Sequence, residues 1–159
     1  MIYDKIEESK LTVGKPNNFK NSSKFLYPIF YEDSELLFTL KNKFYIVDTV
    51  QINNFNKEFI EIKSKQLDEQ INKVANKFNV SIDDNKKYVI NDKTVIKDAK
   101  IDDLRNNRFK ALISISIPTY YEDKNDVKTS LQLYIKEIIV LELISSEIEY
   151  EMTKLSLAI

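Results

Sequence analysis

The sequence predicts a mainly β domain of α+β composition, in which a curved antiparallel sheet is accompanied by two helices. Apolar and polar residues alternate along residues 109–117, with Ile113, Ile115 and Ile117 on the same side. Alternation with a period of two in β-branched residues is typical of a strand with one buried face. A polar loop at residues 122–126 then leads into a second alternating stretch at residues 130–136. The two stretches predict a long antiparallel hairpin.

The returning strand of this hairpin changes its apolar side beyond Lys136. Before that residue the apolar side contains Leu133 and Ile135, and after it the apolar side contains Ile138 and Val140. A slip of one residue predicts a β-bulge, which bends a strand and increases its twist. We therefore expect the hairpin to curve, as strands do at the corner of a barrel.

Several short strand-forming segments precede the hairpin, each bounded by charged or turn-forming residues. They are predicted at residues 10–13, 25–31, 36–40, 44–50 and 58–62. The connections between the second, third and fourth segments are short, which predicts a three-stranded meander. Pro28 lies within the second segment and favours an edge position or a bulge there.

An amphipathic helix is predicted to open at Ser64, because apolar residues recur at spacings of three and four. These residues are Leu67, Ile71, Val74 and Phe78. Residues 80–103 are charged and weakly periodic, with short strands expected at residues 87–90 and 94–96.

A second helix is predicted over residues 147–157. Ser146 and Glu149 have the spacing of a capping box, in which each side chain accepts a backbone hydrogen bond at the start of a helix.

Three strands, a helix and two long strands form the element order of an OB-fold, a five-stranded and partly open barrel. We therefore expect residues 1–159 to form a single domain, an OB-like antiparallel β-barrel with one inserted helix and one C-terminal helix.

The composition excludes several classes of enzyme. The chain has no His and no Cys, which removes the commonest general base, the thiol nucleophile and the usual zinc ligands. Gly14 is the single glycine, whereas a P-loop or a dinucleotide-binding motif needs several. We expect a non-catalytic protein without a cofactor or a bound metal. No apolar run reaches membrane-spanning length and the N-terminus lacks a signal-peptide pattern, so we expect an intracellular protein with no membrane partner.

Aromatic residues alternate with cations along the predicted strands, although the formal net charge of the chain is only −1. Single-stranded nucleic acid binds OB-type sheets by stacking its bases on aromatic rings, while Lys and Arg contact the backbone. Phe38 and Phe109 are assigned to the core, because aromatic residues on strands are mostly buried. The expected contacts to a single-stranded nucleic acid are Tyr27, Tyr31, Lys41, Lys43, Tyr45, Arg105, Arg108, Lys110, Tyr120, Tyr121, Tyr134 and Lys136.

Two other functions remain open. Tyr is enriched at protein interfaces, so the same strands are also compatible with an assembly or scaffold module. A magnesium-dependent nuclease is the enzymatic alternative, in which Asp48 and Glu61 bind the metal and Lys63 assists the attacking water. For Arg105 and Arg108 the competing interpretation is a polar loop with surface ion pairs to neighbouring aspartates, Asp102 and Asp103.

Two segments carry a resemblance to a known family. They read Tyr-Pro-Ile-Phe-Tyr-Glu-Asp-Ser-Glu-Leu-Leu-Phe over residues 27–38 and Ile-Ser-Ile-Pro-Thr-Tyr-Tyr over residues 115–121, the second continued by Ser-Leu-Gln-Leu at residues 130–133. This pattern resembles the conserved strand pairs of single-stranded-DNA-binding proteins from large double-stranded DNA viruses. The resemblance implies coating of replication or recombination intermediates without catalysis, with DNA favoured over RNA. The apolar final strand and helix also favour a homo-oligomer.

Overall fold

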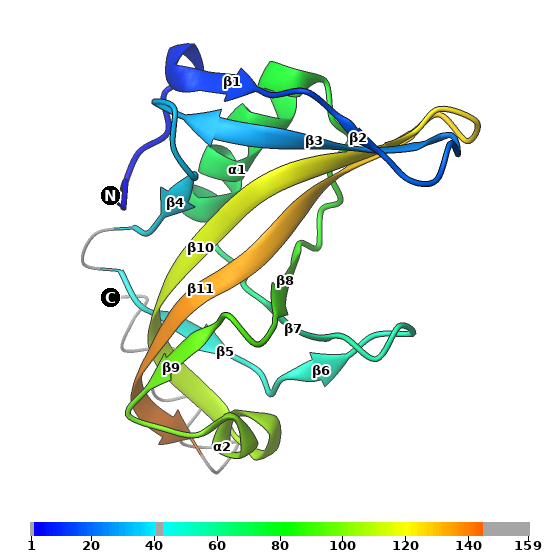
Figure 1. Cartoon of the computed structure of the whole chain (residues 1–159). Helices are drawn as coiled ribbons and strands as arrows, with labels where there is room; N and C mark the ends of the chain where they lie inside the picture. The colour runs from blue at the N-terminus through cyan, green and yellow to red at the C-terminus, as the bar shows by residue number, and fades with distance from the viewer. Residues whose placement is uncertain (1, 41–42, 145–159) are drawn as a thin grey trace.

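A long β-hairpin organises the computed structural model, which describes residues 2–40 and 43–144. Strand β10 (Arg108–Asp123) pairs antiparallel with β11 (Lys128–Ile144), and the two run diagonally across the molecule in Figure 1. The predicted hairpin is confirmed, and it is longer than expected at both ends.

The predicted bulge is also confirmed. Ser114 pairs with Glu137 and the next residue, Ile115, pairs with Ile135, so Lys136 is the extra residue of β11. Two further shifts in register, after Lys110 and after Ser116, add irregularities on either side. Because each bulge increases local twist and bend, the hairpin curves around the core rather than lying flat.

One edge of β10 binds three earlier strands in succession. Strand β3 (Lys24–Tyr31) pairs with its C-terminal end, β4 (Leu37–Phe38) with its middle, and β5 (Tyr45–Val47) with its start. The predicted meander is therefore wrong, since the three strands pair with β10 and not with one another. The physical reason is the length of β10, whose sixteen residues offer one continuous edge to all three short segments.

The other edge of β11 binds two strands in parallel, which corrects the expectation of a wholly antiparallel sheet. These are β8 (Lys87–Ile90) and β9 (Val95–Lys97). Beyond β8 lie β7 (Glu58–Glu61) and β6 (Gln51–Ile52), while β1 (Leu11–Val13) and β2 (Asn17–Asn18) flank β3. The main path through this open, mixed sheet is β1-β3-β10-β11-β8-β7-β6.

Helix α1 (Lys65–Phe78) confirms the predicted inserted helix and covers the sheet behind β3 and β10 (Figure 1). Ser64 is its N-cap, and its hydroxyl accepts a hydrogen bond from the backbone N–H of Leu67 at 3.2 Å. Leu67 and Ile71 are fully buried in the core, together with Phe38 and Phe109 as predicted. The apolar stripe of this helix therefore closes the core.

Two short helical elements were not predicted, namely η1 (Glu8–Lys10) and α2 (Ile101–Asn106). The competing interpretation of residues 105–108 as a polar loop is wrong for the loop, because they form the end of α2 and the start of β10, whereas the ion pair of Arg105 with Asp102 is present. The predicted helix at residues 147–157 lies outside the described residues. Within the described part of the chain, no helix combines the length and the hydrophobicity that crossing a bilayer requires.

We predict that deletion of Lys136 lowers the free energy of unfolding by at least about 3 kcal/mol, because removing the extra residue turns Ile138 and Val140 away from the core. Lys136→Ala is the matched control, because it shortens the side chain but retains the bulge. Urea denaturation followed by circular dichroism measures both variants. Equal stability of the deletion and the substitution would show that the bulge does not set the register.

Candidate nucleic-acid interface

Two of the tyrosines predicted to stack on bases are core residues. Tyr31 is 1% exposed, its ring meets that of Tyr3 edge-on at 4.5 Å, and its hydroxyl accepts a hydrogen bond from the backbone N–H of Glu7 at 3.0 Å. Tyr45 is 7% exposed. Both predictions are corrected, because each side chain lies on the inward side of its strand and a base cannot reach its ring.

Tyr27 and Tyr120 stack on each other across β3 and β10. Their rings are 4.6 Å apart and nearly parallel, at 7°, and Tyr120 also stacks on Phe78 of α1 at 5.4 Å. The Tyr27 hydroxyl donates a hydrogen bond to Glu122 at 2.8 Å, and burial together with this carboxylate raises the pKa of Tyr27 to about 12. Because the ring faces contact one another, this stack joins the sheet to α1, and the ring faces within the stack are not free for bases.

The two arginines are engaged in ion pairs with acidic residues. The Arg105 guanidinium binds both carboxylate oxygens of Glu58, at 2.8 and 2.6 Å, and also Asp102 at 2.5 Å. The Nε atom of Arg108 lies 2.9 Å from Asp48. These contacts lower the pKa of Glu58, mainly through the hydrogen bonds from Arg105. Both side chains connect the segment around α2 to β5 and β7. Their contact with a nucleic-acid backbone stays a prediction.

The other predicted residues are spread over different surfaces. Lys43 is exposed two residues before β5, and the ammonium of Lys110 lies 4.8 Å from the centre of the Phe44 ring. Tyr134 and Lys136 are half-buried on β11, close to the bulge. Lys41 lies outside the described residues. The sequence therefore identified residue types that suit binding of nucleic acid, but the structure does not bring these residues together on one continuous surface.

One surface does combine aromatic rings with unpaired cations, and we call it the arm. The arm consists of residues 15–28 and 119–131, which project together at the upper right of Figure 1. Asp123 fixes its tip, because its carboxylate accepts hydrogen bonds from the Ser23 hydroxyl at 2.7 Å and from the backbone N–H of Asn125 at 3.1 Å. These contacts lower the pKa of Asp123, and the hydrogen bond from Ser23 has the largest effect.

The N-terminal half of the arm, residues 15–28, carries three lysines and no acidic residue. Phe19 is 45% exposed and Phe25 is half-buried, with the ammonium of Lys124 4.6 Å from the Phe25 ring centre. Tyr121 lies on the face opposite Tyr120, since neighbouring residues in a strand alternate. Within the described part of the chain the arm lysines form no ion pair; they are Lys15, Lys20, Lys24, Lys124 and Lys128.

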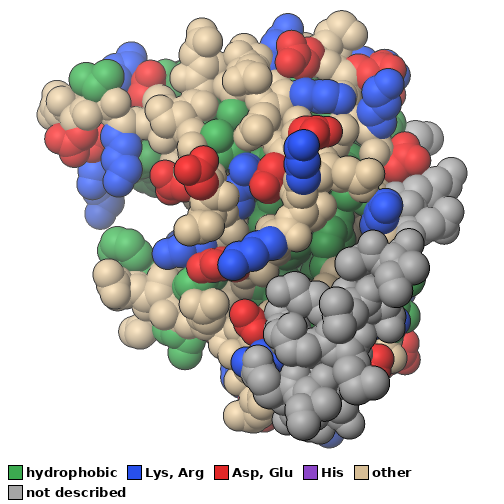
Figure 2. All heavy atoms as spheres, turned by 180° about the vertical axis from the view of Figure 1, so that it is seen from behind, with side chains coloured by type: hydrophobic (Ala, Val, Ile, Leu, Met, Phe, Trp, Pro, Cys, Tyr) green, Lys and Arg blue, Asp and Glu red, His purple; other side chains and the backbone are tan. Residues whose placement is uncertain are grey.

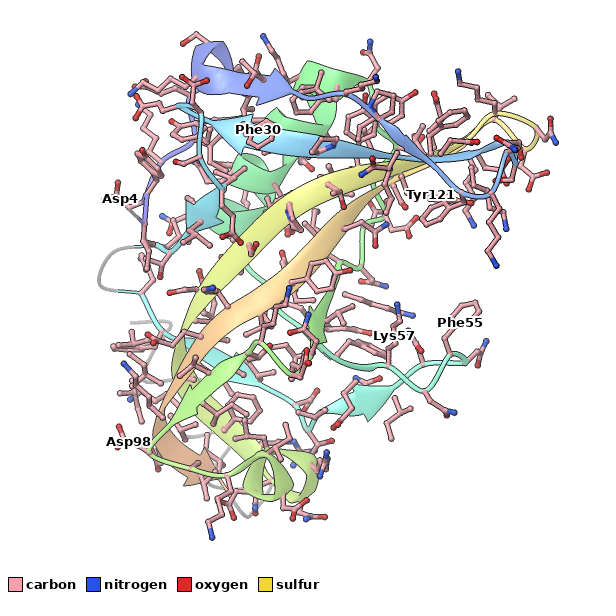
Figure 3. The ribbon with its side chains drawn as sticks, in the orientation of Figure 1. Asp4, Phe30, Phe55, Lys57, Asp98 and Tyr121 are labelled. Carbon is pink, nitrogen blue, oxygen red and sulfur yellow. The ribbon has the colours of Figure 1, made fainter. Side chains whose placement is uncertain are left out.

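A second projection, which we call the finger, is the hairpin of β6 and β7 at residues 51–61. Phe55 at its tip is 82% exposed, and Lys57 lies beside it (Figure 3). The side-chain oxygen of Asn53 accepts hydrogen bonds from the backbone N–H groups of Phe55 at 2.9 Å and Lys57 at 3.0 Å. The turn therefore holds an aromatic ring in solvent, where it has no packing role.

The arm and the finger border a hollow, which we call the notch. Its floor is a pocket of about 540 Å³, lined by the segment of residues 81–87 and by the first residues of β11. Lys87 and Lys128 line it, as do Asp83 and Asp126, so its charge is mixed. Figure 2 shows this hollow from behind, with lysine side chains on the arm above it and apolar side chains below it.

The residues of the nuclease alternative share a different groove, which we call the α1 groove. It has a volume of about 500 Å³ between β5 and the start of α1, and Asp48, Glu61 and Lys63 all line it. Asp48 is bound by Arg108 at 2.9 Å, however, and among the described residues no three His, Cys, Asp or Glu side chains are grouped so that they could hold a metal ion. The groove brings the trio together without a third metal ligand.

Comparisons with known proteins place the whole chain in one family. The profile of DUF5482, described as a family of unknown function, matches residues 1–159, and the chain belongs to this family. A curated relative, named uncharacterized killer plasmid pGKl-2 protein 5 of Kluyveromyces lactis, is 35% identical over 164 aligned residues, which cover 100% of both chains. No solved structure matches the chain.

We predict that Asp123→Asn removes part of the acid sensitivity of the fold. The Asp123 pKa is lowered in the folded state, so its stabilisation is present above the ordinary value of 3.8 and is lost as the pH falls through the folded-state value. The free energy of unfolding of the unmodified protein should therefore fall more steeply from about pH 5 to about pH 3 than that of Asp123→Asn. Asp126→Asn, at an exposed position of the same turn, is the control and should behave like the unmodified protein. The same dependence of the free energy of unfolding on pH in the unmodified protein and in Asp123→Asn would contradict the prediction.

Proposed function

We propose that this member of DUF5482 is a non-catalytic, sequence-tolerant single-stranded nucleic-acid-binding protein whose contacts lie on the arm and the finger. The observation that carries the proposal is the exposure of Phe55 at a hydrogen-bonded turn that faces a lysine-bearing arm across the notch. An aromatic ring held in solvent is costly unless it has a partner, and the π-face of a base is a suitable one. Stacking of this kind does not require a particular base sequence.

The arm supplies the second part of the proposed interaction. Its unpaired lysines are suited to contact phosphates, and the rings of Phe19, Phe25 and Tyr121 lie among them. A strand that crosses from the finger to the arm passes Lys87 and Lys128 at the notch. Binding by backbone charge and base stacking is the mode by which proteins hold single strands without sequence preference.

We propose DNA rather than RNA as the partner. The relative from Kluyveromyces lactis is named as a killer plasmid protein, and a plasmid is a DNA element. The aromatic-proline pattern shared with viral single-stranded-DNA-binding proteins supports the same role, an accessory of replication or recombination inside the cell or, for a viral protein, inside its host cell.

The proposal includes an OB-like barrel and self-association. The curvature that bulges give to β10 and β11 supports a partly open barrel. Leu141 and Leu143 near the end of β11 are 46% and 39% exposed, which supports contact with a second copy of the chain.

Two other functions compete with this proposal. A scaffold module would use the same exposed rings to bind a protein, in which case oligonucleotides would not bind at low salt. A magnesium-dependent nuclease is favoured by the shared position of Asp48, Glu61 and Lys63 in the α1 groove. Cleavage of single-stranded DNA that requires Mg²⁺ and disappears in Glu61→Ala would identify the nuclease.

We predict that Phe55→Ala weakens binding of a fluorescently labelled oligo-dT by about 1–3 kcal/mol, which corresponds to about 5-fold to 150-fold in Kd. Fluorescence anisotropy at low salt measures this change. Phe30→Ala is the matched control, because Phe30 is 37% exposed on β3 and lies away from the notch in Figure 3. Equal Kd values for the Phe55 variant and the unmodified protein would remove the finger from the interface.

We also predict that the double variant Lys124→Ala/Lys128→Ala binds less tightly and with a shallower dependence on salt. Each lysine that neutralises a phosphate contributes about 0.7 to the slope of log K against log salt for a single strand, so the slope should fall by about 1.4. Lys100→Ala, at the start of α2, should leave the slope unchanged. An unchanged slope in the double variant would show that the arm does not contact the backbone.

A further inference from the structure

The α1 groove has the features of a binding site for a phosphate group. It lies between β5 and the segment that leads into α1, with a volume of about 500 Å³, and it is lined by Lys43, Lys63 and Lys65. These three side chains are exposed and form no ion pair within the described residues. The groove therefore concentrates positive charge that the fold itself does not neutralise.

The first turn of α1 adds backbone donors to these lysines. The Ser64 hydroxyl accepts the hydrogen bond of the Leu67 N–H, and the Asp68 N–H bonds to the Ser64 carbonyl at 2.9 Å. The N–H groups of Lys65 and Gln66 have no acceptor among the described residues. Free N–H groups and the helix dipole together favour an anion at this end of a helix.

A largely buried tyrosine that lines the groove provides independent support for a ligand. Tyr45 is 7% exposed and lines the groove, and within the described residues its hydroxyl has no hydrogen-bond partner. Burial raises the pKa of Tyr45 to about 12, so the group is a proton donor at neutral pH. The Tyr45 hydroxyl is therefore a donor without an acceptor in the described part of the protein, which suits a ligand that accepts a hydrogen bond in this groove.

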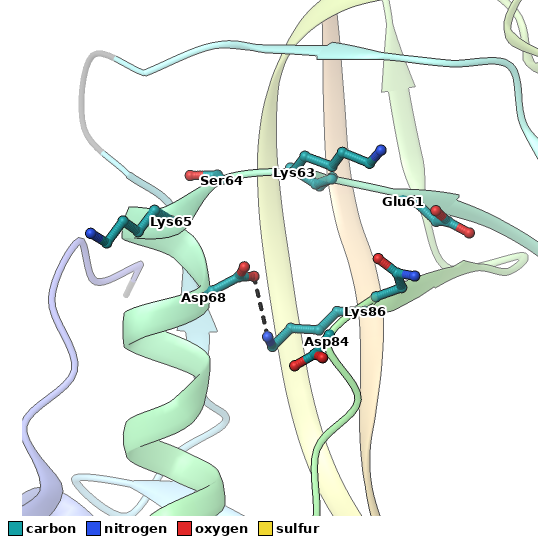
Figure 4. Close-up of a pocket in the computed structure, with 9 residues that line it drawn as sticks. Glu61, Lys63, Ser64, Lys65, Asp68, Asp84 and Lys86 are labelled. Carbon is teal, nitrogen blue, oxygen red and sulfur yellow. Dashed lines mark ion pairs between the residues drawn. The ribbon is translucent and has the colours of Figure 1, made fainter.

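The acidic residues near the groove leave its charge positive. Arg108 binds Asp48 at 2.9 Å, and in the adjoining pocket, which shares Lys63 and Lys65, Lys86 binds Asp68 at 3.3 Å (Figure 4). Figure 4 also shows the side chains of Lys63 and Lys65 pointing away from that ion pair and away from each other, one on either side of Ser64. Glu61 is the acidic side chain that remains, against three lysines and the helix terminus.

We propose that the α1 groove binds the phosphate monoester of a nucleotide, either free or at the 5′ end of a DNA strand. The phosphate accepts hydrogen bonds from the N–H groups of Lys65 and Gln66 and from the Tyr45 hydroxyl, while Lys43 and Lys63 neutralise its charge. Phe44, which is 39% exposed at the rim, offers an apolar ring to the base. None of the residues that line the α1 groove lines the pocket of the notch. Gln51 and Glu61 of the finger do border the groove, but the proposed phosphate contacts come from other residues.

Thymidine monophosphate and two labelled oligo-dT strands, one with a 5′-phosphate and one with a 5′-hydroxyl, test the site. Titration of the nucleotide into ¹⁵N-labelled full-length protein should shift the amide signals of Lys65 and Gln66. By anisotropy the phosphorylated strand should bind about fivefold more tightly than the hydroxyl strand, the effect expected of about 1 kcal/mol at a helix N-terminus. The hydroxyl strand alone reports on the proposed function, so its failure to bind does not affect the nucleotide result.

Variants localise the effect. Lys63→Ala/Lys65→Ala and, separately, Tyr45→Phe should reduce both the amide shifts and the preference for the phosphorylated strand, whereas Lys100→Ala should retain them. Amide shifts without a preference between strands support a free nucleotide as the ligand, and a preference without shifts supports the strand end. A preference that persists in the lysine variant places the phosphate elsewhere and overturns the proposal. The absence of both effects in the unmodified protein also overturns it.

Discussion

The pairing of β10 with β11 is the constraint on which the rest of the structure depends. Every other strand on the main path of the sheet joins it through one of these two, since β3 binds the edge of β10 and β8 binds the edge of β11. The extra residue Lys136 lets Ile135 and Ile138 both face the core although three positions separate them. The bulge thus converts a flat ribbon into a curved support, on which α1 closes one side and the arm projects at one end.

Local patterns in the sequence predicted the elements well and their partners poorly. The capped helix after Ser64 and the bulge at Lys136 follow from residues within a few positions of one another, so they could be read directly. Pairing depends on residues far apart in the chain. Nothing local indicated that β4 and β5 bind β10, or that β8 and β9 run parallel to β11. The predicted meander therefore assigned β4 and β5 the wrong partners, and the predicted antiparallel sheet missed the parallel direction of β8 and β9.

The candidate site was predictable in its chemistry and not in its residues. Tyr31 and Tyr121 both follow another aromatic or apolar residue on a strand, and only the tertiary structure separates the buried ring from the half-exposed one. The competing interpretation of Arg105 included its ion pair with Asp102, which the structure contains, but not its bidentate partner Glu58, which lies 47 positions away. Phe55 could have been found, because a single Phe between asparagines at residues 53–56 has no apolar neighbour with which to form a core face.

The attachment of β3, β4 and β5 to one distant strand has a consequence for synthesis of the chain on the ribosome. Their common partner begins at Arg108, so β3, β4 and β5 cannot join β10 until most of the protein has been made, although β1 and β2 can pair with β3 earlier. Contacts of such long sequence separation form slowly, because the loop that connects the partners must first be closed. During that interval the strand-forming segments of the N-terminal half expose apolar residues and unpaired backbone groups. We therefore expect the nascent chain to expose these segments for longer than a domain built from sequential hairpins does.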